Sequence, residues 1–258
     1  MTTSLNFLDQ YPEGNPGILL LHGLGATGAS WMMQLPVLGR AGYRPIAPDV
    51  PGFGDSVYDR KGWNIPRMAS RMADLVQDLD AGPVHVVGLS MGGVIAQQFT
   101  RDYPNLTRKL VLVSTFSVLR PDNISGWFYF LRRAFTVLVL GLRSQAYVVA
   151  ERIFTHPGQE GLRDMLVATI TSADVRVYRR AMISLARFDS RRWLKDILVP
   201  TLILTGANDT TVLPHRQMLL ADGIAGAKQV VIPNAGHAVS IDQPEKFNQV
   251  LLEFICAP

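Results

Sequence analysis

The chain has one cysteine, few charges and no long apolar run. Cys256 stands alone among 258 residues, which excludes an intramolecular disulfide and a multi-cysteine metal site. The longest strongly apolar stretch without a charge, residues 134–142, has nine residues, whereas a membrane-spanning helix needs about 20. The first fourteen residues lack a basic start, an apolar run and a small-residue cleavage pattern. We therefore expect no transmembrane segment, no secretory signal and a cytoplasmic location.

The charge is unevenly distributed along the chain. The net charge is +4, yet residues 116–193 hold twelve arginines and six acidic residues, a net charge of +6, while the rest of the chain sums to −2. A cluster of like charges is usually a solvated face. The alternative is a basic surface that meets an anionic substrate, carrier or lipid head group. We expect no nucleic-acid partner, and the oligomeric state is not readable from these patterns.

Short apolar runs bounded by glycine or proline alternate with helical patterns along most of the chain. The runs are residues 17–21, 43–47, 84–88, 109–114, 201–205 and 228–232. Continuous apolar runs of this length are typical of strands buried on both faces. Their alternation with helices predicts an α/β fold, with a mostly parallel central sheet flanked by helices. Ligands are expected beyond the carboxyl ends of such strands.

The alternation fails between Phe116 and Trp193. This stretch is rich in arginine and aromatic residues and shows helical patterns without a convincing strand. We therefore predict a core made of residues 1–115 and 194–258, with residues 116–193 inserted as a helical cap. Residues 127–131 and 135–142 offer more apolar surface than one amphipathic helix needs. They either line a substrate channel or seat the insertion on the sheet.

A glycine-flanked serine follows the third buried run. The sequence Gly88-Leu89-Ser90-Met91-Gly92 lies between that predicted strand and a helical pattern. Such a strand-to-helix turn is the setting of a nucleophile elbow, in which small flanking residues let the backbone fold tightly and expose the hydroxyl. The Gly-x-Ser-x-Gly pattern alone is weak evidence, but its position between a strand and a helix makes Ser90 a candidate nucleophile.

A serine hydroxyl needs a base to take its proton, and five histidines compete for that role. His85 lies inside a predicted strand, His156 in the insertion, and His215 at the start of a predicted surface helix. His22 and His237 instead follow strands, where loops pass over the carboxyl edge of the sheet. His237 is the better base because an acidic partner is available on the preceding loop.

That partner is Asp209, which follows the buried run 201–205 after a short polar turn. Its carboxylate could instead form an Asx turn or cap the helix near Pro214. The chain order Ser, Asp, His favours the catalytic role, because it is the order expected of this type of fold.

Acyl transfer also needs two backbone N–H groups aimed at the developing oxyanion. Met91, directly after the candidate nucleophile, is expected to supply one of them. The loop 22–25 is expected to supply the other, with Leu24 as the donor. His22 then holds that loop by bonding to backbone.

These motifs together resemble the α/β-hydrolase superfamily, and the likeness spans nearly the whole chain. They are residues 22–25, 49–56, 88–93, 199–209 and 236–237, in the family's order. The resemblance implies a cap at residues 116–193. With only 16 residues before the first parallel strand, the family's N-terminal hairpin must be shortened, leaving Leu5 to Asp9 as an edge strand at most. Ser90 argues against dehalogenases and epoxide hydrolases of this superfamily, which use an aspartate there.

The resemblance implies a serine hydrolase that cleaves a carboxylic ester through an acyl-enzyme on Ser90. We expect a small ester or acyl substrate, which would be anionic if the basic segment binds it. We expect neither a metal nor an organic cofactor. A lipase, thioesterase, lactonase, carbon–carbon bond hydrolase or perhydrolase of the same fold remains open. So does a ligand sensor that retains the triad without turnover. The physiological substrate and its acyl chain are not readable from these motifs.

Overall fold

The computed structural model of the chain describes residues 5–119, 124, 128, 131–132 and 135–257. Seven strands form one sheet in the order β1-β3-β2-β4-β5-β6-β7. They are β1 (Phe7–Leu8), β2 (Gly17–Leu21), β3 (Arg44–Pro48), β4 (Val84–Leu89), β5 (Thr107–Val113), β6 (Thr201–Gly206) and β7 (Lys228–Ile232). Only β1 pairs antiparallel, with β3, and the other neighbours are parallel. The predicted mostly parallel sheet and its short N-terminal edge strand are confirmed.

The central strands are apolar at every position because the sheet is covered on both faces. In β2, Leu19 and Leu21 belong to the core on one face, whereas Ile18 and Leu20 belong to the core on the other. All four side chains are fully buried. Successive side chains of a strand point to opposite faces, so a strand covered on both sides needs apolar residues throughout.

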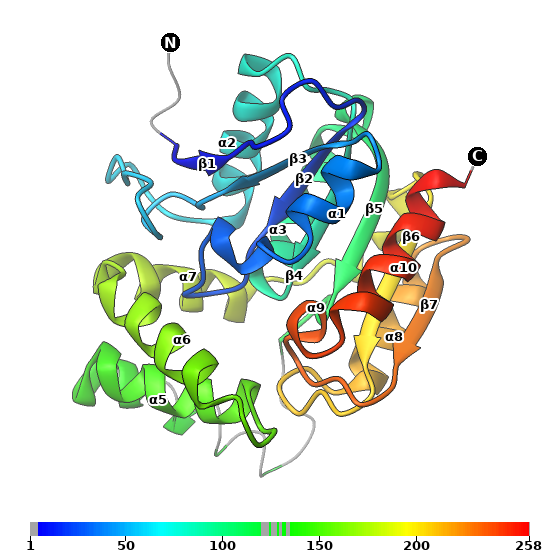
Figure 1. The fold of residues 1–258 in the computed structure, drawn as a ribbon. Helices are drawn as coiled ribbons and strands as arrows, with labels where there is room; N and C mark the ends of the chain where they lie inside the picture. The colour runs from blue at the N-terminus through cyan, green and yellow to red at the C-terminus, as the bar shows by residue number, and fades with distance from the viewer. Residues whose placement is uncertain (1–4, 120–123, 125–127, 129–130, 133–134, 258) are drawn as a thin grey trace.

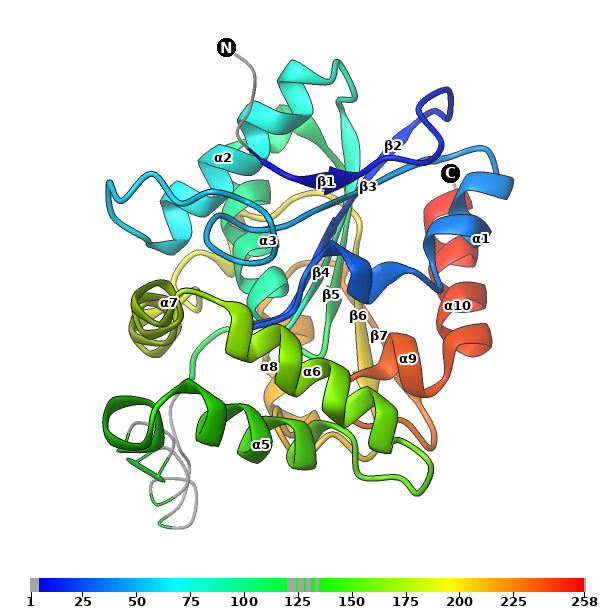
Figure 2. The ribbon, with the colours of Figure 1, turned by 60° about the vertical axis from the view of Figure 1, so that its left-hand side comes forward.

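Helices cover the two faces of the sheet. The first core contains residues of α2 (Ile65–Asp78), α3 (Met91–Asp102) and α8 (Pro214–Gly223). The second contains residues of α1 (Leu35–Arg40) and α10 (Pro244–Cys256). Figure 2 shows the sheet nearly edge-on, with α2 and α3 on one side and α1 and α10 on the other. This arrangement leaves the carboxyl ends of the strands accessible to loops and to a further layer.

That further layer comes from the segment between β5 and β6. Its described helical elements are the short π-helix η3 (Thr136–Leu140), α5 (Leu142–Ile153), α6 (Glu160–Ser172) and α7 (Val175–Arg187). Figure 1 shows α5, α6 and α7 beyond the ends at which β4, β5 and β6 finish. Among the described residues of this segment, extended pairing is limited to an isolated bridge between Val118 and Asp189. The described part of this segment is therefore mostly helical.

The predicted apolar stretches 127–131 and 135–142 differ in burial where they are described, since Val137 and Leu142 are buried in the first core. Phe128, Leu131 and Phe135 are 69%, 58% and 55% exposed. Trp127, Tyr129 and Phe130 lie outside the described residues. Within the described part of the chain, no helix is long and apolar enough to cross a membrane.

Candidate active site

Ser90 occupies a strained turn between β4 and α3. Its backbone angles are φ 53° and ψ −112°, a combination that residues with a side chain rarely adopt. A Cβ atom on Gly88 would collide with the backbone of Gly92, and a Cβ atom on Gly92 would collide with the carbonyl of Leu21. Both flanking glycines are thus required by close approach of backbone to backbone. This is the local reason why the chain can fold into an elbow here.

Hydrogen bonds from β5 and the loop after it hold the elbow in place. The Ser90 amide donates to the carbonyl of Val113 at 2.9 Å. The Thr115 hydroxyl donates to the carbonyl of Ser90 at 2.7 Å. With both of its backbone polar groups bonded, Ser90 keeps its unfavourable conformation, and its side chain lines a pocket.

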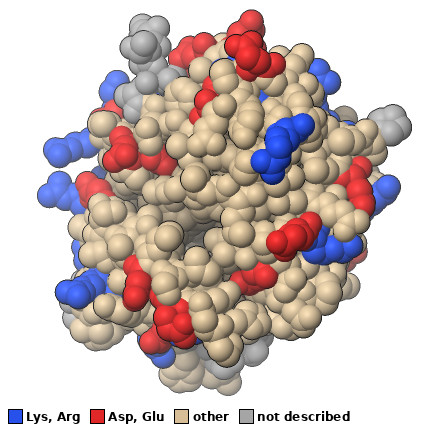
Figure 3. Space-filling model, viewed as in Figure 1, with Lys and Arg blue, Asp and Glu red and all other residues tan. Residues whose placement is uncertain are grey.

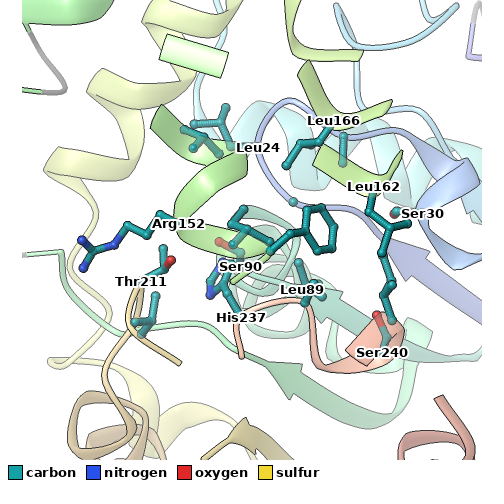
Figure 4. Close-up of a pocket in the computed structure, with 18 of the residues that line it drawn as sticks. Leu24, Ser30, Leu89, Ser90, Arg152, Leu162, Leu166, Thr211, His237 and Ser240 are labelled. Carbon is teal, nitrogen blue, oxygen red and sulfur yellow. The ribbon is translucent and has the colours of Figure 1, made fainter. Parts of the chain in front are cut away.

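His237 and Asp209 form a buried pair beside Ser90. Nδ1 of His237 lies 2.9 Å from Oδ2 of Asp209, and the residues are 4% and 2% exposed. A carboxylate accepts hydrogen bonds, so this contact puts the imidazole proton on Nδ1 and leaves Nε2 able to accept another. Figure 4 shows His237 next to Ser90. The loops after β4, β6 and β7 thus bring the three predicted residues to one place.

The Asp209 carboxylate makes both an Asx turn and a contact with His237, and its catalytic role stays a prediction. Its Oδ1 accepts the amide protons of Thr211 and Val212 at 2.8 and 2.9 Å, which makes an Asx turn. Its Oδ2, which faces His237, also accepts from Nε2 of Gln217 at 3.2 Å. The turn uses Oδ1 and the contact with His237 uses Oδ2, so the turn holds the carboxylate in place for that contact. Gln217 was not singled out from the sequence.

His22 holds the loop after β2, as predicted. Its Nδ1 donates to the carbonyl of Gly23 at 2.8 Å, while its Nε2 accepts the amide proton of Val50 at 2.9 Å. The ring is fully buried, and burial lowers the pKa of His22 below its ordinary value. The neutral ring is the form that can make both bonds at once, because a protonated imidazole has no acceptor.

This loop brings the predicted oxyanion donors close to the nucleophile. A Cβ atom on Gly23 would lie 3.7 Å from the Cβ of Ser90. Leu24 lines the same pocket as Ser90, and Met91 is the first residue of α3. These positions suit the donor roles predicted for the amides of Leu24 and Met91, and the roles themselves stay predictions.

A pocket of about 720 Å³ contains Ser90 and His237. Its walls are largely apolar, and α5, α6 and α7 contribute many of them, including Val149, Leu166 and Leu185. The exposed Phe128, Leu131 and Phe135 do not line it, whereas Phe116 and Leu119 from the start of the same segment do. Figure 3 shows a hollow on one face of the molecule, bordered mostly by residues that are neither acidic nor basic.

The three other histidines lie outside this pocket. His85 is buried in β4, where burial and then the positive charges of Lys109 and Arg108 lower its pKa to about 4. His215 is exposed on α8, and His156 follows α5. The described part of the chain contains no group of three or more His, Cys, Asp or Glu residues suited to a metal ion.

A sequence comparison decides the family. A family model described as alpha/beta hydrolase fold matches residues 16–244 of the chain. The chain belongs to the alpha/beta hydrolase fold family. Over 256 residues, this α/β hydrolase is 33% identical to a protein from Variovorax paradoxus that is provisionally named carbamate hydrolase RutD, with 95% of this chain and 93% of that protein covered. A protein of the same name from Azorhizobium caulinodans is 31% identical, covering 96% and 94%.

Solved structures agree with this placement. A thermophilic esterase from Thermogutta terrifontis superposes with a TM-score of 0.85 at 30% identity, covering 97% of this chain and 92% of that one. An enol-lactonase from Burkholderia xenovorans LB400 superposes with a TM-score of 0.87 at 23% identity, which shows a common fold alone. The chain therefore stands among the hydrolases of this fold.

One further carboxylate of this α/β hydrolase supports the histidine loop. Oδ2 of Asp242, in α9 (Val239–Asp242), accepts the amide proton of Gly236 at 2.8 Å. Its Oδ1 accepts from Nε2 of Gln159, just before α6, at 2.7 Å. Asp242 thus ties the residue before His237 to the helices between β5 and β6. Asp242 was not singled out from the sequence, and its contact with Gln159 joins residues 83 positions apart in the chain.

Proposed function

We propose that the chain is a serine hydrolase that cleaves carboxylic esters through an acyl-enzyme on Ser90. One observation carries the proposal: Ser90, on its strained elbow, shares an apolar pocket with His237, which is bonded to the buried carboxylate of Asp209. Acyl transfer requires a serine next to a base that can take its proton, and the contact with Asp209 orients His237 for that role.

In the proposed mechanism, Oγ of Ser90 attacks the ester carbonyl carbon while Nε2 of His237 takes the hydroxyl proton. The bond to the alcohol oxygen then breaks, and His237 returns the proton to the leaving alcohol. Water attacks the acyl-serine in the same manner, which releases the acid and restores Ser90. Asp209 keeps the imidazole in the required tautomer and stabilises its positive charge. The amides of Leu24 and Met91 bind the oxyanion.

Residues 116–193 act in this proposal as a cap over the core formed by residues 1–115 and 194–258. The support is that α5, α6 and α7 supply a large share of the pocket wall while the candidate triad comes from loops of the core. A wall of this kind lowers the polarity around the reacting groups and selects the substrate, while water still reaches the acyl-serine for its hydrolysis. A cytoplasmic location stays a prediction from the sequence.

The experiment is turnover of short aryl esters by the wild-type chain and by Ser90→Ala and His237→Ala. We expect each substitution to lower kcat by about 10⁴-fold or more, because members of a triad act as a unit. Undiminished turnover by Ser90→Ala would remove Ser90 from the mechanism. Labelling of Ser90 by a fluorophosphonate without multiple turnover of any ester would favour the alternative of a ligand sensor.

The name shared by the two relatives supports a second candidate, hydrolysis of a carbamate. An aryl carbamate would pass through a carbamoyl-serine at the same Ser90, so the structure suits both substrates. The test is kcat/KM on an aryl ester and an aryl carbamate of matched size. We expect the ester to react faster, and a higher kcat/KM on the carbamate would replace the ester assignment. The same panel, extended to lactones and thioesters, ranks the remaining alternatives.

A further inference from the structure

The charged residues in the wall of the pocket are of one sign. Arg152 and Arg216 line it, and its wall contains no Asp or Glu among the residues that the structure describes. The rest of the wall is largely apolar. In such surroundings a guanidinium interacts more strongly with an anion than it does in water. On the face seen in Figure 3, by contrast, lysine and arginine side chains are scattered rather than gathered at the hollow.

Both arginines are held at their places by backbone carbonyls. Arg152, in the last turn of α5, donates from Nη2 to the carbonyl of Thr210. Arg216, in the first turn of α8, donates from Nη1 to the carbonyl of Val118 at 3.4 Å. A guanidinium has five N–H groups, and these bonds to carbonyls fix the place of each side chain.

The polar side chain of Thr211 lines the pocket together with the two arginines. Oγ1 of Thr211 is buried and has no hydrogen-bond partner in the described structure, although buried hydroxyls nearly always have one. Figure 4 shows Arg152 and Thr211 on one side of Ser90 and Leu162 and Ser240 on the other. Rotation about the Cα–Cβ bond of Thr211 would turn its hydroxyl towards a ligand bound by Arg152.

We propose that Arg152, Arg216 and Thr211 form a subsite for a carboxylate carried by the substrate at some distance from the scissile ester. The planar guanidinium matches the two oxygens of a carboxylate, and the largely apolar remainder of the pocket wall suits a hydrocarbon body. The substrate class is therefore an ester with an apolar body and a free carboxylate at one end. This inference rests on the proposed function, because it names the substrate of the same pocket.

The test compares matched pairs of esters, each with a free carboxylate in one member and its methyl ester or amide in the other. One pair carries the group at the end of the acyl chain and a second pair carries it on the alcohol. We expect kcat/KM to favour the anionic member of at least one pair by about 10-fold, the contribution of one charge-assisted hydrogen bond. The preference should shrink as salt is raised.

Variants assign the preference to residues. Arg152→Gln and Arg216→Gln should each lower kcat/KM for the anionic member by about 10-fold more than for the neutral member. Arg152→Lys keeps the charge and should retain part of the preference. Arg143→Gln is the matched control, because Arg143 lies on the same helix α5, is exposed and does not line the pocket. Its selectivity should equal that of the wild type.

A binding measurement separates failure of the subsite from failure of the proposed function. In Ser90→Ala, calorimetric titration should give a Kd about 10-fold lower for the anionic member, and Arg152→Gln in this background should abolish the difference. Equal binding of both members would overturn the subsite whether or not the wild type turns them over. Hydrolysis of neutral esters with equal rates on both members of each pair would also overturn it and would leave the ester hydrolase intact.

Discussion

Gln217 ties the acid of the candidate triad to the end of β6. Its Nε2 donates to Asp209 at 3.2 Å and to the carbonyl of Val212 at 2.8 Å. Its Oε1 accepts from the Thr205 hydroxyl at 2.9 Å. A side chain that is fully buried and bonded at both ends of its amide has one available orientation. Gln217 is therefore a positioning residue for the Asp209 carboxylate.

Replacing Gln217 with leucine should lower kcat by about 10-fold and the free energy of unfolding by about 1–3 kcal/mol, because buried polar partners are left without bonds. KM should change little. The measurements are steady-state kinetics on an aryl ester and urea unfolding. Gln229→Leu is the matched control, since Gln229 donates to Thr205 in the same network without touching Asp209. Equal losses of kcat in both variants would contradict a role specific to Asp209.

His85 predicts how stability depends on pH. Its pKa is lowered to about 4 in the folded chain, against 6.5 for the free side chain. Between these values the unfolded chain binds a proton that the folded chain does not, so the free energy of unfolding should fall as pH drops from about 6.5 to about 4. His22, whose pKa is also lowered, should contribute in the same direction.

A phenylalanine at position 85 tests this dependence. His85 packs edge-on against Tyr43, with ring centroids 5.8 Å apart, and its Nδ1 is buried without a hydrogen-bond partner in the described structure. Phenylalanine keeps the ring and removes the titrating group. Chemical unfolding at pH 7.5 and pH 5 should therefore show a smaller loss on acidification for His85→Phe than for the wild type. If His85→Phe and the wild type lose the same amount of unfolding free energy on acidification, other titrating groups cause the loss.

At the scale of elements, the turn from β4 into α3 depends on glycine where α3 packs against β2. Gly92→Ala would drive a methyl group into the backbone of Leu21 and His22. We expect a loss of about 2 kcal/mol or more in unfolding free energy and a fall in kcat, because the Ser90 turn must shift. Gly161→Ala, in α6, is the control, since a Cβ there meets no atom within 4 Å. It should stabilise the chain slightly and leave kcat unchanged.

The contact of Asp242 with Gln159 joins α9 to the start of α6. Gln159→Ala removes this link and leaves the bond from the Gly236 amide to Asp242 in place. We expect a higher KM with little change in kcat, because the pocket wall loosens while the histidine loop stays held. Asp242→Ala breaks both contacts and should lower kcat as well. A fall in kcat for Gln159→Ala as large as that for Asp242→Ala would show that the two contacts are not separable.

The elements that could be predicted from sequence are those fixed by burial and by local backbone geometry. β2 is apolar at all five positions because both of its faces are covered, and this signal is visible without any neighbour. Gly88 and Gly92 mark the elbow because no other residue fits there. The helices between β5 and β6 were predictable as helices, but their apolar residues did not reveal which would face the pocket.

The parts of the site that escaped prediction are side-chain contacts that depend on how the loops fold. Gln217 and Asp242 are ordinary polar residues in sequence, and their roles come from side chains that the fold brings to them. The uneven charge of residues 116–193 indicated an anionic ligand or a solvated face without separating the two. The segment contains arginines in both settings, since Arg152 lines the pocket whereas Arg143, on the same helix, is exposed outside it.

For the molecule as a whole, we propose that loops at the carboxyl edge of the sheet supply the chemistry and that the helices beyond this edge supply much of the pocket wall. Ser90 and His237 belong to the first part, and Val149 and Leu166 belong to the second. Substitutions at Val149 or Leu166 should therefore change KM and the ranking of substrates more than they change kcat. Equal effects on kcat for all substrates would contradict this division.

The most direct test of the central claim is mass spectrometry of the protein quenched during turnover of an aryl ester. We predict that the wild-type chain gains the mass of one acyl group, located on Ser90 by peptide analysis, and that the adduct decays at the rate of deacylation. His237→Ala should not accumulate it at a comparable rate, and Ser90→Ala should not form it. An adduct on another residue, or steady turnover by Ser90→Ala without any adduct, would contradict the account.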